Sequence, residues 1–380
     1  MHGCFNDHSP VHFTGRLCRI QIAGALACLL ALFASPALAL KLAVMGDSLS
    51  DEYGEASYGL YAVNWVEQLE IYAGIDLGPT ASEAAQPGGT WGEPRRTLHQ
   101  FNWARSGASS NTLISEGQHT GVSSVVASDN VEYGVLFIGA NDFYPSDAAY
   151  LGIYTGTWTQ LQIDQHVADV LANINTALDE MESAGLPMII LNVPDYGIAP
   201  AVAAVLTDAA GRQSVTDVID GLNASIDAVA QARGMVIVDI GAGLVSIFGT
   251  HASPNTSLLV GNVPIDLTAS DTAGGGNPTA GFVHDGVHPN TVLQGIIANS
   301  VLEALNIGFG AGLTLFTEAE ILGHRGIAYG GSDTLSATYG DYSDYITAYP
   351  EPTLAVPALG GIGSLVLVAL LAGVVRRQLH

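Results

Sequence analysis

Cysteine is confined to the first 28 residues of this 380-residue chain. Its three cysteines, Cys4, Cys18 and Cys28, lie within a segment that has the features of a secretion signal. The mature protein would therefore contain neither a thiol nor a disulfide, which excludes a disulfide-stapled framework. A chain of this length can instead form one α/β domain with a substantial hydrophobic core.

Basic residues are also scarce. Between residues 40 and 349, seven Lys and Arg stand against 34 Asp and Glu, a net charge of −27. Such a surface repels phosphate backbones and anionic lipids, and the sequence has no basic stripe, so we predict no nucleic-acid partner. His251, His324 and the histidines outside the motif described below lack paired metal-ligand spacing. We therefore predict no metal and no other cofactor.

The N-terminal segment predicts export. Arg16 and Arg19 precede an apolar run at 22–33, and residues 36–39 (Pro-Ala-Leu-Ala) supply small side chains at the −3 and −1 positions of a cleavage site. We predict a signal peptide over residues 1–39, cleaved at its end. A buried N-terminal helix is the alternative.

The other end of the chain has the composition of a membrane anchor. An uncharged, mainly apolar segment at 353–375 is followed by Arg376 and Arg377, and about 20 apolar residues are enough to cross a bilayer. The arginines favour a cytoplasmic C-terminus, which places residues 40–349 outside the inner membrane. We expect residues 328–349, rich in Tyr, Asp and Gly, to form a linker.

Pro350-Glu351-Pro352 stands directly before the apolar segment, and these features in this order resemble the PEP-CTERM sorting signal of Gram-negative bacteria. The resemblance implies that residues 350–380 form a sorting signal with one transmembrane helix. It also implies an exosortase that cleaves near the triplet, so that a protein first anchored in the inner membrane reaches the cell surface or the extracellular space. A plain C-terminal anchor is the alternative.

Residues 40–327 have the pattern of one α/β domain. Short apolar runs predict buried strands, and amphipathic periodicity predicts long helices between them. Their alternation indicates a parallel sheet with helices on both faces. The predicted strands are 41–45, 131–138, 188–193 and 235–240, and the predicted helices are 161–184 and 212–232.

Two segments rich in Gly, Pro or small polar residues are expected to be irregular. Residues 76–96 contain four Gly and three Pro and form a candidate wall of the substrate cleft. Residues 243–282 are expected to form a long loop. Residues 317–320 (Thr-Glu-Ala-Glu) have the pattern of a capping box that opens a short helix.

Ser48 follows the first predicted strand within the sequence Gly-Asp-Ser-Leu-Ser-Asp at 46–51. The carboxyl ends of parallel strands form the ligand crevice of such folds, so its hydroxyl would be exposed on a rigid support. Asp285 and His288 place a carboxylate and an imidazole three residues apart. The imidazole can take the proton that a weakly nucleophilic hydroxyl must lose, and the carboxylate can orient the imidazole. The alternative for Ser48 is a helix cap, and the alternative for Asp285 and His288 is a helix-capping or surface pair.

Two further loops directly follow apolar segments. Residues 139–142 (Gly-Ala-Asn-Asp) contain Asn141, and residues 102–108 contain Gly107. The side-chain amide of Asn141 and the backbone N–H groups of Ser48 and Gly107 could converge on the oxyanion of a tetrahedral intermediate. A plain turn role is the alternative for Asn141.

Together these loops resemble the sequence blocks of the GDSL/SGNH hydrolase family, over about residues 41–306. The letters S, G, N and H in the family name stand for four residues, and they are matched in the same order by Ser48, Gly107, Asn141 and His288. The resemblance implies a flavodoxin-like three-layer α/β/α fold with a central parallel sheet. It also implies that Ser48 is the nucleophile, His288 the base and Asp285 its orienting group, with an oxyanion hole from Ser48, Gly107 and Asn141.

The sequence departs from the family pattern at residues 51–54, where Asp-Glu-Tyr-Gly replaces the commoner Asp-Thr-Gly-Asn. We predict an exported serine hydrolase that cleaves carboxylic esters, with an acyl lipid, a small ester or an acylated polysaccharide as substrate. An O-acetyl esterase of the extracellular matrix and a non-catalytic binding module on a hydrolase scaffold are the alternatives. The fold does not decide among substrates.

Overall fold

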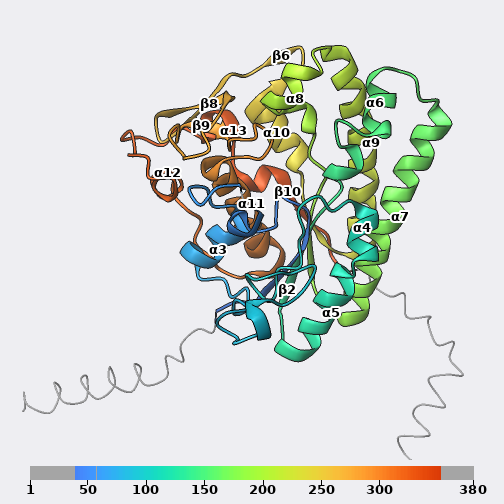
Figure 1. The fold of residues 1–380 in the computed structure, drawn as a ribbon, viewed down its shortest axis with the longest axis vertical. Helices are drawn as coiled ribbons and strands as arrows, with labels where there is room; N and C mark the ends of the chain where they lie inside the picture. Colours follow the sequence, from blue (N-terminus) through green and yellow to red (C-terminus); the bar gives the residue numbers. More distant parts are fainter. Residues whose placement is uncertain (1–38, 57, 352–380) are drawn as a thin grey trace, which may run out of the picture. The chain divides into compact units, whose positions relative to one another are not determined.

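A five-stranded sheet lies at the centre of the fold (Figure 1). The computed structural model describes residues 39–56 and 58–351, so residues 1–38 of the predicted signal peptide and the predicted membrane-spanning segment lie outside the described residues. Four strands are parallel, and the fifth joins one edge antiparallel in the order β1-β2-β3-β4-β10. They are β1 (Leu42–Gly46), β2 (Tyr133–Phe137), β3 (Met188–Leu191), β4 (Val236–Val238) and β10 (Ile346–Ala348).

All four predicted strands are present, and nearly all of their residues are buried because helices cover both faces of the sheet. The fourth strand ends earlier than predicted. Asp239 caps helix α10 (Ile240–Phe248), and its side chain accepts a hydrogen bond from the Ala242 N–H at 3.0 Å. The apolar run therefore continues from a strand directly into a helix.

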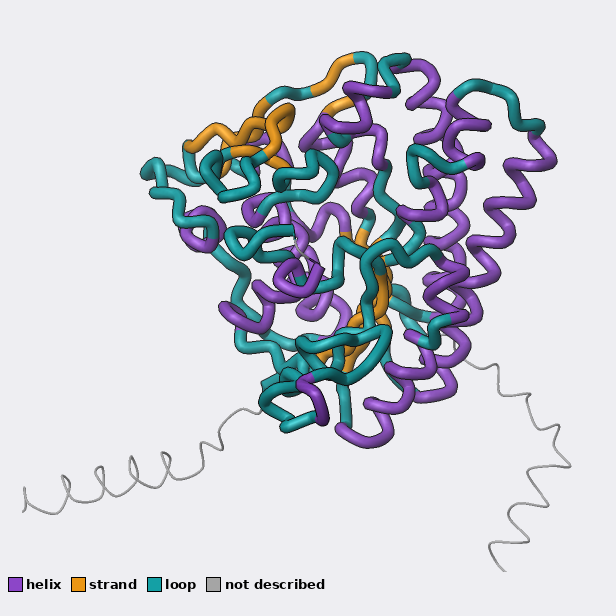
Figure 2. The backbone as a smooth tube through the Cα atoms, in the orientation of Figure 1, coloured by secondary structure: helices purple, strands orange, loops and turns teal. Residues whose placement is uncertain are grey.

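Helices cover the sheet in two layers (Figures 1 and 2). The two helices predicted from periodicity are confirmed as α7 and α9, and buried side chains recur along α7 every three or four residues. The expected three-layer α/β/α arrangement is thus confirmed. One layer holds α4 (Ser110–Ser115), α5 (Gln118–Asp129), α7 (Gln160–Ala184) and α9 (Ala209–Arg233), and the other holds α3 (Trp65–Ala73) and α11 (Thr291–Phe309).

Helix α11 is the one helix in the described part of the chain that is long and apolar enough to cross a membrane. However, 67 % of its most apolar stretch is buried inside the protein. Its composition therefore reflects its position in the core rather than contact with lipid.

The expectation of a long loop over residues 243–282 is wrong. After α10 the chain forms two small sheets, in which β7 and β8 pair as an antiparallel hairpin (Figure 2). Gly261 and Asn262 make its two-residue turn, both with positive φ, and buried residues alternate with exposed ones along both strands. The strands are β5 (Gly249–Thr250), β6 (Ser253–Pro254), β7 (Ser257–Val260), β8 (Val263–Ser270) and β9 (Ala280–Phe282).

Residues 328–349 do not form the expected linker, because they pack onto the fold. They contain α13 (Ser336–Tyr339), the 3₁₀ turn η4 (Tyr342–Tyr345) and strand β10, which pairs with β4. The tyrosines supply the packing surface: Tyr339 is 4 % exposed, and the Tyr349 hydroxyl donates to Asp227 at 2.8 Å. The folded region therefore extends past residue 327.

Residues 76–96 are irregular, as predicted, apart from the short turn η1 (Pro87–Gly89). Arg95 lies over the rings of Trp91 and Trp103, which ties the segment to the rest of the fold. The capping box at Thr317 is also confirmed, and it opens helix α12. The remaining short helices are α2 (Tyr53–Ala56), η2 (Ala140–Phe143), α6 (Ala148–Tyr154), η3 (Tyr196–Ile198), α8 (Pro200–Val205) and α12 (Glu318–His324).

Candidate active site

Ser48 lies in a tight turn that directly follows β1. The backbone N–H groups of Ser50 and Asp51 both donate to the carbonyl of Asp47, and the Asp47 carboxylate accepts from the Leu49 N–H at 3.0 Å. Ser48 is only 3 % exposed. The turn therefore holds the hydroxyl rigidly at the carboxyl end of the sheet, where ligands bind in folds of this kind.

Asp285 and His288 lie in the loop between β9 and α11. One carboxylate oxygen of Asp285 accepts from the backbone N–H groups of Val287 and His288, at 2.8 and 3.0 Å. The other oxygen lies 2.6 Å from His288 Nδ1. A single carboxylate thus fixes both the backbone of the loop and the orientation of the imidazole ring.

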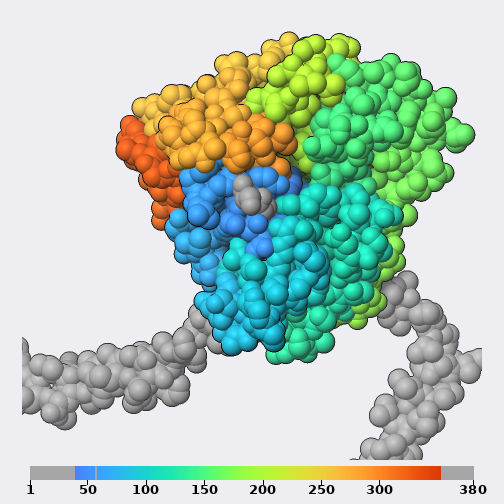
Figure 3. Space-filling view, in the orientation of Figure 1, coloured from blue at the N-terminus to red at the C-terminus, as the bar shows by residue number. Residues whose placement is uncertain are grey.

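The structure brings His288 and Ser48 together although 240 residues separate them. His288 Nε2 lies 2.7 Å from Ser48 Oγ. Since Nδ1 donates its proton to Asp285, Nε2 carries the lone pair and accepts from the serine hydroxyl. Figure 3 shows the segment that follows β1 (blue) meeting the segment around residues 270–290 (orange) on one face. The hydrogen-bonded chain from carboxylate to imidazole to hydroxyl can transfer the hydroxyl proton to His288.

The charge on Asp285 is favoured by its surroundings. Burial opposes ionisation, but it is outweighed by the hydrogen bond from His288, by the attraction to this ring when it is protonated and by the backbone N–H groups of His288 and Val287, which together lower the pKa of Asp285. The carboxylate therefore stays ionised to a lower pH than an aspartate side chain in water would.

Two tyrosines that we did not single out from the sequence support His288. The Tyr58 ring lies against the imidazole, with 4.0 Å between ring centroids. The fully buried Tyr53 donates from its hydroxyl to the Pro289 carbonyl at 2.9 Å and accepts from Gln294 at 2.6 Å. The departure from the family pattern at residues 51–54 thus supplies a support for the histidine loop.

Asn141 lies in η2, which is separated from the end of β2 by two residues, and both the oxygen and the nitrogen of its side-chain amide are hydrogen-bonded. The Tyr196 hydroxyl donates to Asn141 Oδ1 at 2.9 Å, and Asn141 Nδ2 donates to the Ala108 carbonyl at 3.0 Å. Its second amide hydrogen remains available. Within the described residues, the backbone N–H groups of Ser48 and Gly107 donate to no protein acceptor. Three donors from three loops are therefore free to bind an anionic oxygen.

Further contacts join the serine turn to the loop that contains Gly107. The Asp51 carboxylate accepts from the Ser106 N–H at 2.8 Å and lies 3.8 Å from the Arg105 guanidinium. Asn102 donates to the Ser50 carbonyl at 2.9 Å. These buried polar contacts fix the position of one loop relative to the other.

His284 does not join the Ser48–His288 pair. It is exposed, and its backbone N–H and ring Nδ1 contact the Tyr61 hydroxyl at 3.1 and 3.2 Å. It therefore helps to shape the loop. Among residues 39–56 and 58–351, no group of three or more His, Cys, Asp or Glu side chains is placed to hold a metal ion.

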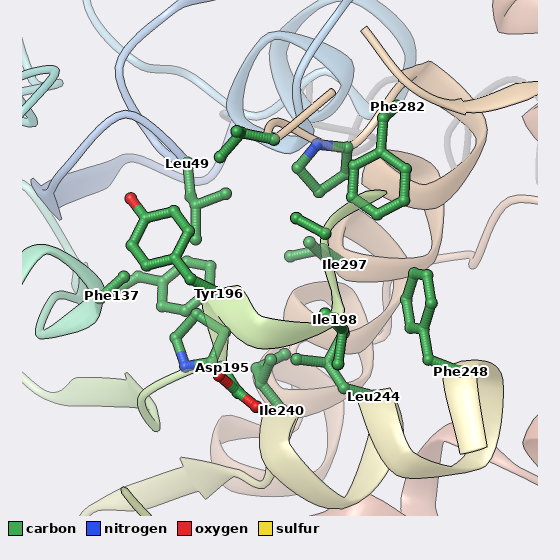
Figure 4. A pocket seen from close by; sticks show the side chains of 15 residues that line it. Leu49, Phe137, Asp195, Tyr196, Ile198, Ile240, Leu244, Phe248, Phe282 and Ile297 are labelled. Carbon is green, nitrogen blue, oxygen red and sulfur yellow. The ribbon is translucent and has the colours of Figure 1, made fainter. Parts of the chain in front are cut away.

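Two apolar cavities adjoin the site and share Tyr196 and Val287 in their linings. The inner cavity has a volume of about 60 Å³. In Figure 4, Leu49 and Tyr196 form one side of it, and Phe248 and Phe282 the other. The outer cavity is larger, about 390 Å³. Neither is lined by residues 76–96, so the expected role of that segment as a cleft wall gains no support.

Comparison with known proteins gives one family match and several matches to solved structures. The family model described as "GDSL-like Lipase/Acylhydrolase" matches residues 42–301. A lipase from a goat rumen metagenome is 14 % identical in sequence. The alignment covers 70 % of this chain and 97 % of the lipase, with a TM-score of 0.40. An acetylxylan esterase from Geobacillus stearothermophilus is 16 % identical in sequence. The alignment covers 70 % of this chain and 94 % of the esterase, with a TM-score of 0.37. No curated protein matches the chain.

Proposed function

Since the chain belongs to the family of GDSL-like lipases and acylhydrolases, we propose that it hydrolyses carboxylic esters through an acyl-enzyme intermediate on Ser48. The observation that carries this proposal is the hydrogen-bonded chain from Asp285 through His288 to Ser48 Oγ, with distances of 2.6 and 2.7 Å. A serine hydroxyl becomes an effective nucleophile when an oriented base accepts its proton.

The proposed reaction has two halves. Ser48 Oγ attacks the ester carbonyl carbon while its proton passes to His288 Nε2, and the carbonyl oxygen becomes an oxyanion bound by the N–H groups of Ser48, Gly107 and Asn141. The carbon–oxygen bond to the alcohol then breaks, and the alcohol leaves with the proton from His288. Water next attacks the acyl-enzyme, with His288 again as base, and the free acid leaves as the Ser48 hydroxyl is restored.

An organophosphonate probe that reacts with serine hydrolases tests the nucleophile. We expect the probe to label the wild-type protein and Ser48→Ala to remove the label, because the hydroxyl that it modifies is missing. His288→Ala should abolish ester turnover, since the hydroxyl then lacks its base. Label that persists on another serine would overturn the assignment of Ser48.

We also propose that the protein is exported and first anchored in the inner membrane, then released by an exosortase near Pro350-Glu351-Pro352. The signal-like and apolar segments support export and anchoring. Pro350 and Glu351 are exposed, separated from the end of β10 by one residue, which is compatible with access by a protease.

Expression of the full chain with and without an exosortase tests this proposal, followed by mass measurement and membrane fractionation. A released product of the same mass in both strains would rule out the exosortase step. A full-length chain that is soluble without detergent would rule out the anchor.

A further inference from the structure

We propose that His251 positions the oxyanion hole. It holds the carboxylate of Asp195, which restrains the backbone on both sides of Tyr196, and the Tyr196 hydroxyl in turn binds the Asn141 amide. His251 itself lies in the turn between β5 and β6, outside the hydrogen-bonded chain that ends at Ser48. The inference rests on the proposed function, because it assigns a further residue to the same reaction.

The Asp195 carboxylate forms a hydrogen bond that spans Tyr196. Asp195 is the N-cap of η3, and its Oδ1 accepts from the Gly197 N–H at 2.6 Å. Tyr196 lies between these two residues, so the hydrogen bond restrains the backbone from which its ring extends. Figure 4 shows the side chains of Asp195 and Tyr196 pointing to opposite sides of this segment. The carboxylate therefore anchors the segment on one side, while the Tyr196 hydroxyl meets Asn141 on the other.

The second oxygen of the Asp195 carboxylate, Oδ2, is bound by two side chains. Oδ2 lies 2.8 Å from His251 Nε2 and accepts from the Thr216 hydroxyl at 2.7 Å. The side chains of Asp195 and His251 are 9 % and 6 % exposed. A carboxylate buried to this degree needs such donors, because little water can reach it to replace them. His251 therefore supplies one of the contacts that keep Asp195 in place.

Arg212 selects the form of His251 that can donate to Asp195. The Arg212 Nε–H donates to His251 Nδ1 at 3.3 Å, so Nδ1 carries the lone pair and Nε2 carries the hydrogen. Arg212 is 8 % exposed and also donates to the Leu206 carbonyl. The imidazole thus links a buried guanidinium to a buried carboxylate. An apolar side chain in its place would leave each of them with one partner fewer.

Helix α9 holds the same segment at two other points. Thr216, which binds Asp195, lies on α9. Asn223 lies there too, and its side chain makes two hydrogen bonds with the Val193 backbone, at 2.8 and 2.9 Å. These contacts do not involve His251. Its replacement should therefore leave the segment folded but hold Tyr196 less precisely, so we expect a loss of rate without a loss of the fold.

Replacement of His251 tests the positioning role by steady-state kinetics, with p-nitrophenyl acetate and the full-length protein. His251→Leu should lower kcat about three- to tenfold, which is the effect of one neutral hydrogen bond. It should change KM less than twofold, because an oxyanion donor acts mainly in the transition state. His251→Gln should keep at least half of the wild-type kcat, since a glutamine amide can present an N–H to Asp195.

His324→Leu is the matched control. His324 is another partly buried histidine, but it lies on α12, and its contacts are with Gln68, Tyr72 and Phe316. Both leucine variants should lower the midpoint of thermal unfolding, whereas only the one at His251 should lower kcat. Equal losses of kcat in the two variants would overturn the proposal, because they would show a general effect of stability.

A double variant separates a positioning role from a purely structural one. If His251 acts through Tyr196, then His251→Leu should lower kcat less than about 1.5-fold in the Tyr196→Phe background, where the hydroxyl that it positions is already missing. A full three- to tenfold loss in that background would overturn the proposal. An effect of His251→Leu on KM alone, or an unchanged kcat, would do the same.

Thr216→Val tests the Asp195 step by a second route, in case His251→Leu does not fold. It removes the other side-chain donor to Oδ2 while keeping the shape of the side chain, and should lower kcat about two- to fivefold. Thr176→Val is its control, since each threonine hydroxyl donates to the carbonyl four residues earlier, but Thr176 is exposed on α7. An unchanged kcat in folded Thr216→Val would overturn the proposal. Absence of wild-type turnover on every ester would instead overturn the esterase function itself, and the positioning role with it.

Discussion

The Tyr196 hydroxyl donates a hydrogen bond to Asn141 Oδ1 at 2.9 Å, and so fixes which end of the Asn141 amide is the oxygen. Asn and Gln amides can turn end for end, and only their hydrogen bonds fix the orientation. Tyr196 binds the oxygen of the Asn141 side chain, and one of its two amide hydrogens bonds to the Ala108 carbonyl. The other hydrogen is therefore the only one that this amide can donate to the substrate. Tyr196 is thus expected to position Asn141 in the proposed oxyanion hole.

Tyr196→Phe should lower kcat about two- to tenfold with less than a twofold change in KM for an acetate ester. The reason is that one neutral hydrogen bond contributes about 0.5–1.5 kcal/mol, while the ring that lines the cavities is retained. Steady-state kinetics provide the measurement. Tyr329→Phe, which removes an exposed hydroxyl bonded to Asp333, should change neither constant. If Tyr196 acts through Asn141, its replacement should add little to the loss in Asn141→Ala.

Asn141→Ala should lower kcat about 10²–10³-fold with little change in KM. An oxyanion donor contributes mainly in the transition state, because the carbonyl oxygen gains its full negative charge only there. The two constants are separated by measuring initial rates over a range of ester concentrations. An effect on KM alone would show that Asn141 binds the ground-state substrate instead.

Asp285→Asn should lower kcat about 10³–10⁴-fold. The amide keeps an oxygen for the backbone N–H groups of Val287 and His288, but presents an N–H to His288 Nδ1, which stabilises the wrong tautomer. Single-turnover kinetics check the rate, and thermal unfolding checks that the variant is folded. A loss of less than tenfold in a folded variant would remove Asp285 from the proposed mechanism.

Asp47→Asn should stabilise the protein at pH 8 and have little effect near pH 4. Burial, with a smaller contribution from the charges of Asp142 and Asp51, raises the pKa of Asp47 from 3.8 to about 7. The folded state therefore holds a proton that the unfolded chain releases, so this group destabilises the fold increasingly from pH 4 to pH 7 and fully above that range.

The expected gain in the free energy of unfolding at pH 8 is at most about 4 kcal/mol, measured by urea denaturation at both pH values. Asp164→Asn, an exposed position on α7, serves as the control and should show no such pH dependence. Equal effects of Asp47→Asn at pH 4 and pH 8 would contradict the prediction.

The sequence predicted those parts of the fold that carry a repeated local pattern. Helices α7 and α9 were predictable because each is 25 residues long and places apolar residues at regular intervals on one face. The β7–β8 hairpin also carried a local signal, the Gly261-Asn262 turn between alternating residues, but the polar composition of its surroundings obscured it. Strand β10 carried none: it has three residues, and it pairs Ile346 with Val238 over more than 100 residues of chain.

In the candidate site, too, some contacts were predictable from the sequence and others were not. The adjacency of Asp285 and His288 was predictable because three residues separate them within one loop. The supports from Tyr58 and Tyr196 were not, because a tyrosine in a loop has no local pattern that indicates which distant residue it will contact. Their roles arise only from tertiary contacts with His288 and Asn141.

Strand β10 makes the solubility of the folded domain depend on where the chain is cut. It covers the backbone edge of β4, whose three residues Val236–Val238 are all apolar. An uncovered apolar edge of this kind can pair with the edge of another copy of the protein. Cleavage at the Pro-Glu-Pro triplet would leave this cover in place. A cut before residue 346 would remove it and favour self-association, which sets an upstream limit for any processing that yields a monomer.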